Sequence, residues 1–406
     1  MNKIDFPIFH NNPDLVYLDN SATTQKPKAV IDSITNFYEN YNSNVHRGIH
    51  KLAEKSTQEF EKARIDLAKF IGANPKEIVF TSGTTESLNL LSQMLYSLFK
   101  DTKEKRIILL SEMEHHSNIL PWMILAKKLK WDVEYIKLTE DYELDLEDLH
   151  KRIKERNVSI LSLTHTSNVL GMINNLDEIF SKVKKSSSDT ICVGDGAQYV
   201  PHHRINLSKS NNIDFYAFSG HKIMGPTGIG VLYGKINHLE KLKPTKVGGG
   251  MISTVNRNSF TYADLPEKFE AGTPNISGAI GLAAAVNYFE QWNSLEVEKH
   301  MSEMIQLALN ELNNIDEVTL YGPQNLEKRG PVFSFSIDGI HPHDIAQLLD
   351  QDDIAIRAGH HCCQILHRET LKVSATSRAS LYIYNDTEDI IKLSNSIKNI
   401  ITKFKR

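Results

Sequence analysis

A lysine on a turn of small residues is the first candidate for chemistry in this chain. Lys222 lies in Ser-Gly-His-Lys-Ile-Met-Gly, residues 219–225, between two strand-like runs. A lysine held there can be partly desolvated, which lowers its pKa and makes the neutral amine available as a nucleophile toward a carbonyl group. Lys222 is therefore a candidate Schiff-base lysine. The alternative is a solvated loop lysine, the common fate of this residue type.

A second candidate is a phosphate site at residues 81–86, Thr-Ser-Gly-Thr-Thr-Glu, which follow a strand-like run and precede a helical run over residues 87–98. Small hydroxyl residues and a glycine at a helix start present free backbone N–H groups and the positive dipole end to an anion. Ser82 or Thr84 could equally be an ordinary N-cap. The segment lacks the lysine of a Walker A loop, which disfavours a nucleoside triphosphate.

An acid and a histidine stand at the ends of two further runs. Asp195 lies between glycines, where a partly buried carboxylate needs a cationic partner such as a protonated ring nitrogen. The alternative is an ordinary turn aspartate. His115, in Glu-His-His at residues 114–116, could stack on an aromatic ligand or hydrogen-bond within its loop.

Residues 357–364, Arg-Ala-Gly-His-His-Cys-Cys-Gln, combine two histidines with two cysteines. Neighbouring residues of an extended segment point to opposite sides and no second Cys/His cluster completes a tetrahedral set, so we predict no metal site. Cys362, on a glycine-hinged loop beside imidazoles, is better suited to be a reactive thiolate. Arg357 and Arg378 add positive charge and could bind a carboxylate; the alternative for each is a surface ion pair.

Seven short apolar runs must position these residues. They cover residues 77–80, 106–110, 133–136, 159–163, 190–193, 215–218 and 230–233. Most are separated by stretches long enough for a crossover helix, which predicts an α/β fold class with a large domain built on a mostly parallel seven-stranded sheet covered by helices. Ligands of such sheets bind outside the carboxyl ends of the strands, where the polar candidates occur.

A smaller α+β domain is predicted toward the C-terminus. After about residue 275 a long helical stretch runs to residue 312, followed by a strand over residues 331–337 and a helical tail. We place the large domain at residues 16–275. The small domain comprises residues 1–15 and 276–406 and carries the loop with Cys362.

The composition is that of an ordinary soluble globular protein. The chain has 406 residues, of which 40% are hydrophobic and 24% charged, and a net charge of −4, so it has no general attraction for nucleic acid or an anionic membrane. No run approaches the roughly 20 apolar residues of a spanning helix, and three cysteines are too few for a disulfide framework. We expect a cytoplasmic protein with at least one free thiol.

These features together describe a site for pyridoxal phosphate. The chain also resembles the SUF-type (type II) cysteine desulfurases, which are class V pyridoxal-phosphate enzymes of fold type I. The motifs that carry the resemblance include residues 17–22, 44–50, 194–198, 219–225, 357–362 and 378–385. The resemblance implies a homodimer that converts L-cysteine to L-alanine. It also implies that sulfur is transferred to Cys362 as a persulfide, passed to an acceptor protein of the SUF system, and used for iron–sulfur cluster assembly.

The resemblance also implies a role for each site residue. Catalysis would depend on Lys222, Cys362 and His115. The residues implied to bind the cofactor are Lys222, Asp195, Gln198, His115, Thr84, Thr85, Ser219, His221 and, from the other subunit, Thr273. Those implied to bind substrate are Asn168, Arg378, Arg357 and His50. Lys222 would take the Cα proton and the Cys362 thiolate would attack the substrate sulfur.

Some features leave other interpretations open. Cys363, directly after the acceptor position, departs from the family pattern, as do Asn20 and residues 364–369. The short interval from Cys362 to Arg378 favours the type II branch. Alternative functions are a selenocysteine lyase or another class V lyase or aminotransferase, and a non-enzymatic metal-binding or sulfur-relay scaffold that uses residues 360–363.

Overall fold

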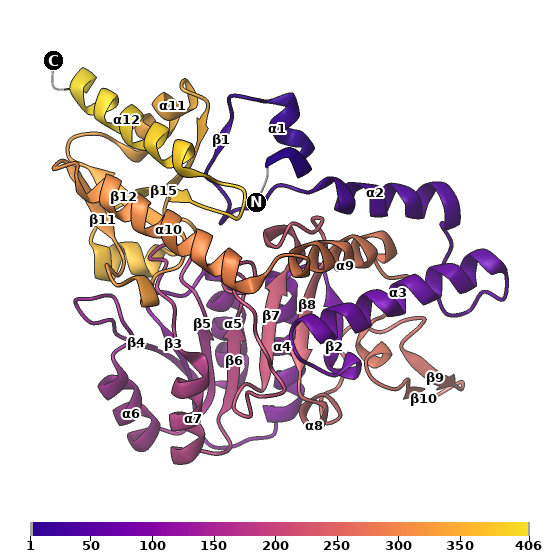
Figure 1. Cartoon of the computed structure of the whole chain (residues 1–406). Coiled ribbons are helices and arrows are strands. Elements are labelled where there is room, and N and C mark those ends of the chain that lie inside the picture. The colour runs from indigo at the N-terminus through magenta and orange to yellow at the C-terminus, as the bar shows by residue number, and fades with distance from the viewer. Residues whose placement is uncertain (1–2, 405–406) are drawn as a thin grey trace.

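The computed structural model describes residues 3–404. Figure 1 shows a large α/β body and a smaller group of elements above it, in which the start of the chain lies beside its last third. Strand β1 (Val16–Tyr17) pairs with β13 (Ile354–Ala355) in parallel, which joins these two distant segments. The domain boundaries expected from the sequence stay a prediction.

A mostly parallel sheet of seven strands forms the centre of the large body within residues 3–404. Its spatial order is β2-β8-β7-β6-β5-β3-β4, and β8 is antiparallel to both of its neighbours. The strands are β2 (Ile78–Thr81), β3 (Ile107–Ser111), β4 (Asp132–Ile136), β5 (Val158–Thr164), β6 (Ile191–Asp195), β7 (Phe215–Ser219) and β8 (Gly230–Gly234). All seven predicted strands are confirmed, with ends that differ by one or two residues.

Helices cover both faces of this sheet because successive side chains of a strand point to opposite faces. In β3, Ile108 and Leu110 pack into one core cluster, whereas Ile107 and Leu109 pack into the other. The first cluster contains side chains of α4 (Thr84–Phe99) and α5 (Leu120–Leu129). The second contains side chains of α3 (Lys51–Phe70), α7 (Leu176–Ser186) and α9 (Ile276–Glu290). Two short helices complete the body, α6 (Leu146–Glu155) and α8 (Ile236–Leu239).

The smaller group of elements contains an antiparallel sheet in the order β11-β12-β15-β14. Its strands are β11 (Val318–Tyr321), β12 (Val332–Ile337), β14 (Arg357–Gly359) and β15 (Thr376–Ser380), and its helices are α1 (Pro7–Asn11), α10 (Ser294–Asn313), α11 (Pro342–Asp350) and α12 (Thr387–Phe404). The predicted strand over residues 331–337 is confirmed. The prediction of a single helical stretch to residue 312 is wrong, because two helices cover this region. The first ends at Glu290, and Asn293 caps α10 by accepting from the backbone N–H of Leu295.

An arm extends to one side of the molecule and is formed by α2 (Lys28–Asn36), α3 and a hairpin of β9 (Ile252–Val255) and β10 (Phe260–Tyr262). Figure 1 shows all three elements on the side away from α6 and α7. The hairpin was not predicted, because its strands are short and mostly exposed. None of the helices between residues 3 and 404 combines the length and apolar character needed to cross a membrane.

Candidate active site

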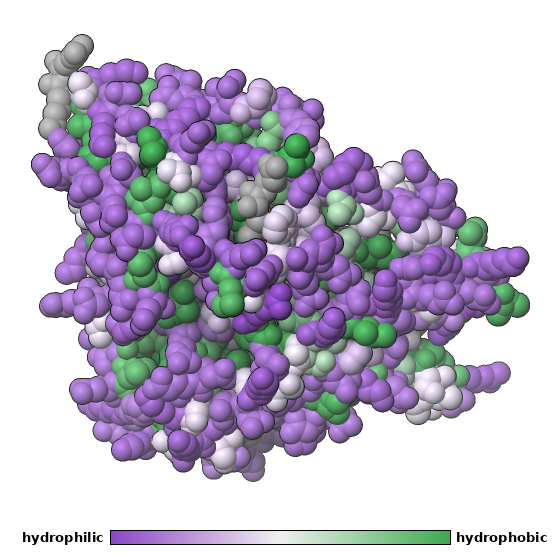
Figure 2. All heavy atoms as spheres, in the orientation of Figure 1, coloured by the Kyte–Doolittle hydropathy of each residue, from purple (hydrophilic) through white to green (hydrophobic). Residues whose placement is uncertain are grey.

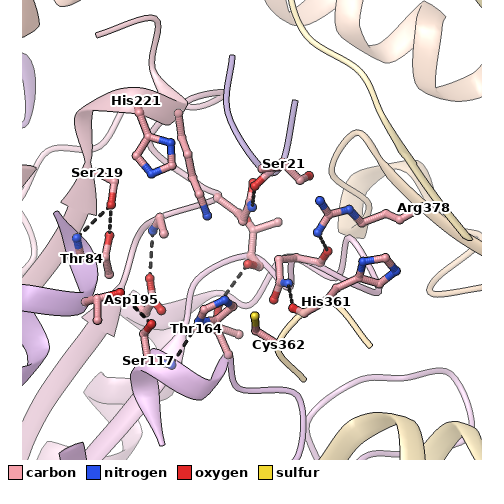
Figure 3. A pocket seen from close by; sticks show the side chains of 18 of the residues that line it. Ser21, Thr84, Ser117, Thr164, Asp195, Ser219, His221, His361, Cys362 and Arg378 are labelled. Atoms are coloured by element: carbon pink, nitrogen blue, oxygen red, sulfur yellow. Dashed lines mark hydrogen bonds between the residues drawn. The ribbon is translucent and has the colours of Figure 1, made fainter. Parts of the chain in front are cut away.

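A cavity of about 200 Å³ opens where β5 and β6 end and where β7 leads into the turn that carries Lys222. Figure 3 shows Thr84 and Ser219 on one side of it and His361 and Arg378 on the other. The cavity brings together most of the residues singled out in the sequence: Thr84, Thr85, His115, Asn168, Asp195, Gln198, Ser219, His221, Lys222, Arg357, Cys362 and Arg378. Residues from eight separate segments of the chain thus share one small space.

Lys222 closes the short 3₁₀ helix η5 (Gly220–Lys222) that follows β7. The turn is anchored through the carbonyl oxygen of His221, which accepts from the backbone N–H of Thr24 at 3.1 Å and from the Thr23 hydroxyl at 3.0 Å. In the described part of the chain, the Lys222 amine has no hydrogen-bond or ion-pair partner. Burial lowers the pKa of Lys222 to about 8, and the charge of Asp195 only partly opposes this effect. The amine is therefore held ready as a nucleophile or base.

The start of α4 forms an anion cradle. Gly83 is the N-cap residue, with φ 148°, and an added Cβ there would lie 3.1 Å from the Ser219 hydroxyl. The backbone N–H of Thr84 donates to that hydroxyl at 2.8 Å, while the backbone N–H groups of Thr85 and Glu86 have no protein acceptor within residues 3–404. The plain N-cap alternative for Ser82 or Thr84 is wrong, since neither side chain caps the helix. Free N–H groups at a helix N-terminus favour a bound phosphate.

Asp195 ends strand β6 and is almost fully buried, with 3% exposure. Its Oδ1 accepts from the backbone N–H of Ala197 at 3.0 Å, so it does stabilise a turn, but Oδ2 has no partner in the described residues. Burial raises the pKa of Asp195, which means that a cation placed against Oδ2 would be strongly favoured. Nearby, Gln198 donates from Nε2 to the backbone oxygen of Ser21 at 2.7 Å.

His115 lies on the cavity wall as the N-cap residue of η4 (His116–Asn118). Its Nδ1 accepts from the backbone N–H of Ser117 at 3.1 Å, which holds the ring in one orientation. Burial and the neighbouring Lys222 lower the pKa of His115 to about 3. A neutral ring that is held in one orientation at the wall of a cavity is suited to stacking on a flat ligand.

Arg378, on β15, is buried with 1% exposure and is not a surface residue. Its Nη2 donates to Asp19 at 3.0 Å and its Nη1 donates to the backbone oxygen of Asn168 at 3.1 Å, while Nε is buried without a partner. The Asn168 side chain is partly committed as well, because its Nδ2 donates to the backbone oxygen of His361 at 2.8 Å. Arg357 lines the same side of the cavity, so two guanidinium groups are available to an anionic substrate.

The two adjacent cysteines lie in different surroundings. Cys362 is partly exposed in the cavity, whereas Cys363 is fully buried with its sulfur 3.1 Å from Asn168 Oδ1, and burial raises the pKa of Cys363. The segment is not extended as expected: His361 has φ 49° and Cys362 has φ 59°, so two consecutive non-glycine residues are left-handed. Such residues cost on the order of 1 kcal/mol each and persist only where neighbours hold them. The described residues contain no group of three metal-ligand side chains.

Two predicted residues lie outside the cavity. His50 is exposed and caps α3, accepting from the backbone N–H of Ala53 at 3.3 Å, and Thr273 lines a separate hollow beside Glu270 and Lys246. The cavity also contains residues that the sequence analysis did not assign: Ser21, Ala22, Ser117, Thr164, Thr166, Ala197 and His361. Thr164 could have been found from the strand-end rule, since it closes β5.

Known proteins are similar to this chain over nearly its full length. The family model for aminotransferase class V matches residues 16–393. A protein described as a probable cysteine desulfurase from Halalkalibacterium halodurans is 45% identical over 97% of this chain and 95% of its own length. Among solved structures, an apo cysteine desulfurase from Thermococcus onnurineus NA1 matches with a TM-score of 0.93 at 38% identity, covering 99% of this chain and 97% of its own. A cysteine desulfurase from Escherichia coli matches with a TM-score of 0.89 at 35% identity, covering 98% and 97%.

Proposed function

Because this chain belongs to the aminotransferase class V family, we propose that it is an L-cysteine desulfurase that uses pyridoxal 5'-phosphate and transfers the sulfur of cysteine to Cys362. The observation that carries the proposal is that Cys362 and Lys222 line the same 200 Å³ cavity although 140 residues separate them in sequence. A nucleophilic amine and a thiol around one small substrate are what this reaction requires.

The residues present fit the proposed cofactor. The free N–H groups at the start of α4, with the hydroxyls of Thr84 and Ser219, are suited to its phosphate, and the unpartnered Oδ2 of Asp195 to its ring nitrogen. Lys222 has a free amine to bind its carbonyl carbon, and His115 would cover the ring. When bound, this cofactor links covalently to amines and accepts electrons from the substrate Cα.

The protein side chains would then perform the remaining steps. Arg378 and Arg357 would bind and orient the substrate carboxylate, and the Lys222 amine would remove the Cα proton. The Cys362 thiolate would attack the substrate sulfur, so that a new S–S bond forms as the Cβ–S bond breaks. The electron pair of the broken bond stays with the carbon fragment, which takes up protons and leaves as alanine.

The proposal includes a homodimer and a sulfur acceptor of the SUF system for iron–sulfur cluster assembly. His50, which caps helix α3, and Thr273 both lie outside the chain's own cavity, which is where residues that complete the site of a second subunit would be. The arm also exposes apolar side chains, among them Ile49 at 95% and Val255 at 66% exposure. Figure 2 shows apolar residues among hydrophilic ones on this side of the molecule. Apolar surface of this kind favours burial between subunits.

The deciding experiment is mass spectrometry of the purified enzyme after brief exposure to L-cysteine, with alanine quantified in parallel. We expect a sulfur adduct on Cys362, together with alanine. The Cys362→Ala variant should keep the visible absorbance of the cofactor but form no alanine, and Lys222→Ala should lose that absorbance. Undiminished cysteine turnover by Cys362→Ala would overturn the proposal. Parallel turnover of selenocysteine and cysteine sulfinate separates the desulfurase from a related lyase.

A further inference from the structure

We propose that His116 is a positioning residue that holds the Cys362 loop in its transfer geometry, so that sulfur transfer depends on His116 while cysteine binding does not. This inference rests on the proposed function, because it concerns Cys362 as the sulfur acceptor. His116 follows the cavity residue His115 directly, yet it does not line the cavity itself. It therefore acts through the loop and not by touching the substrate.

Two hydrogen bonds join His116 to the part of the loop that directly follows the Cα atom of Cys362. The backbone N–H of His116 donates to the backbone oxygen of Cys362 at 2.7 Å. Its ring Nε2 accepts from the backbone N–H of Gln364 at 3.1 Å. One residue thus binds the carbonyl group of the acceptor cysteine and the amide two residues later, which fixes both the position and the direction of this short segment.

The ring must be neutral to accept this second bond, and its surroundings favour the neutral form. Partial burial and the nearby His360, whose ring centroid is 5.7 Å away, lower the pKa of His116. His360 supports the same loop, since its Nδ1 accepts from the backbone N–H of Cys362 at 3.2 Å. The two imidazoles thus secure the backbone on both sides of the Cys362 peptide.

The loop needs such support because of its backbone conformation. His361 and Cys362 both have left-handed φ angles, 49° and 59°, which non-glycine residues rarely adopt. A segment of this kind relaxes to ordinary conformations unless neighbouring groups hold it. A further restraint, the hydrogen bond from Asn168 Nδ2 to the backbone oxygen of His361 at 2.8 Å, comes from the cavity side and stays intact when His116 is changed.

The test compares three variants of the full-length enzyme with cofactor bound. His116→Leu removes the ring acceptor, and His116→Asn keeps a polar group but places it near the position of Nδ1, too short to reach the Gln364 amide. His116→Gln extends its amide oxygen to about the position of Nε2 and is the rescue variant. All three variants keep the hydrogen bond from the backbone N–H of residue 116 to the backbone oxygen of Cys362. Differences among them therefore report only the contact between the side chain of residue 116 and the Gln364 amide.

Two rates are measured in each variant after rapid mixing with L-cysteine. The first is the rate of the absorbance change that accompanies substrate binding to the cofactor. The second is the rate of persulfide formation on Cys362, measured by quenching the reaction at set times and analysing the protein by mass spectrometry. We expect His116→Leu and His116→Asn to slow persulfide formation at least roughly tenfold, because small misplacements of a reacting group have effects of this size. The rate of the absorbance change on substrate binding should stay within about twofold of the wild-type rate. His116→Gln should recover most of the lost rate.

Hydrogen exchange of residues 360–364 in the cofactor-free protein gives a readout that does not require activity. The Gln364 amide should exchange faster in His116→Leu and His116→Asn than in His116→Gln. Unchanged exchange and unchanged persulfide formation in the first two variants would overturn the inference. An equal loss of both rates would also overturn it, because His116 would then act on the cofactor site. A wild-type enzyme that forms no persulfide on Cys362 refutes the proposed function instead, and the exchange measurement still decides whether His116 holds the loop.

Discussion

The lowered pKa of Lys222 predicts how fast the cofactor-free enzyme captures pyridoxal 5'-phosphate at different pH values. Burial lowers this pKa from 10.5 to about 8. At pH 7 roughly one Lys222 side chain in ten is then neutral, compared with about one in three thousand for an ordinary lysine. Burial therefore makes the neutral amine roughly three hundred times more abundant, which corresponds to a change on the order of 3 kcal/mol in the free energy of deprotonation.

The assay is a stopped-flow measurement of the visible absorbance that appears when pyridoxal 5'-phosphate binds, between pH 6 and pH 10. We expect the second-order rate constant to rise about tenfold for each pH unit below pH 8 and to level off above it, because only the neutral amine reacts. Pyridoxal, which lacks the phosphate, is the matched control. It should bind more slowly but show the same midpoint, since the midpoint belongs to Lys222.

A rate constant that still rises tenfold between pH 9 and pH 10 would refute the reasoning, because Lys222 would then titrate as a solvated lysine. The Asp195→Asn variant tests the direction in which the charge of Asp195 shifts the pKa of Lys222. The charge of Asp195 raises the pKa of Lys222 and opposes the effect of burial. Removing it should therefore move the midpoint below pH 8, and a move to higher pH would contradict the electrostatic interpretation.

Three further predictions follow from buried groups. Cys363→Ala should retain most of the desulfurase activity, because Cys363 is fully buried beside the acceptor, and a loss as large as that of Cys362→Ala in the same alanine assay would contradict this. Arg64→Met should lower the free energy of unfolding by about 3–5 kcal/mol in urea titrations, since it leaves the carboxylate of Glu270 buried without its bidentate partner. The double variant Arg64→Met with Glu270→Gln should recover part of this loss, and no recovery would argue against the ion pair of Arg64 and Glu270 as its origin. Burial alone would raise the pKa of Asp214, but hydrogen bonds from His238, from the backbone N–H of Cys192 and from Lys184 outweigh it and lower the pKa below the ordinary value. Asp214→Asn should therefore destabilise the protein at neutral pH and progressively less as the pH falls below about 4, and an equal effect at pH 7 and pH 3 would exclude this origin.

Local patterns were sufficient for the large sheet and for most of the site. Buried parallel strands are short and continuously apolar, so each of the seven could be recognised by itself, and the polar residues at their ends meet because the carboxyl ends share an edge. Lys222 and Asp195 were therefore predictable as neighbours. The hairpin of β9 and β10 was not, because its exposed strands carry no apolar periodicity.

Other features depend on contacts between distant segments. The break after Glu290 reflects the packing of α9 against α2 and α3 and the cap at Asn293, whereas the apolar pattern by itself runs through. The burial of Arg378 depends on the approach of Asp19 and Asn168, which are more than 200 residues away in sequence.

The amino-acid sequence by itself determined the chemistry available to this protein: an amine nucleophile at Lys222, an acid at Asp195, an anion-binding helix start and a thiol at Cys362. Residue type and strand-end position are local properties, so they could be inferred before folding was considered. Only the tertiary structure decided which of two adjacent thiols faces the cavity and that His116 contacts the acceptor loop. Burial, pKa and backbone strain arise from atoms brought together across the whole chain, and no local pattern specifies them.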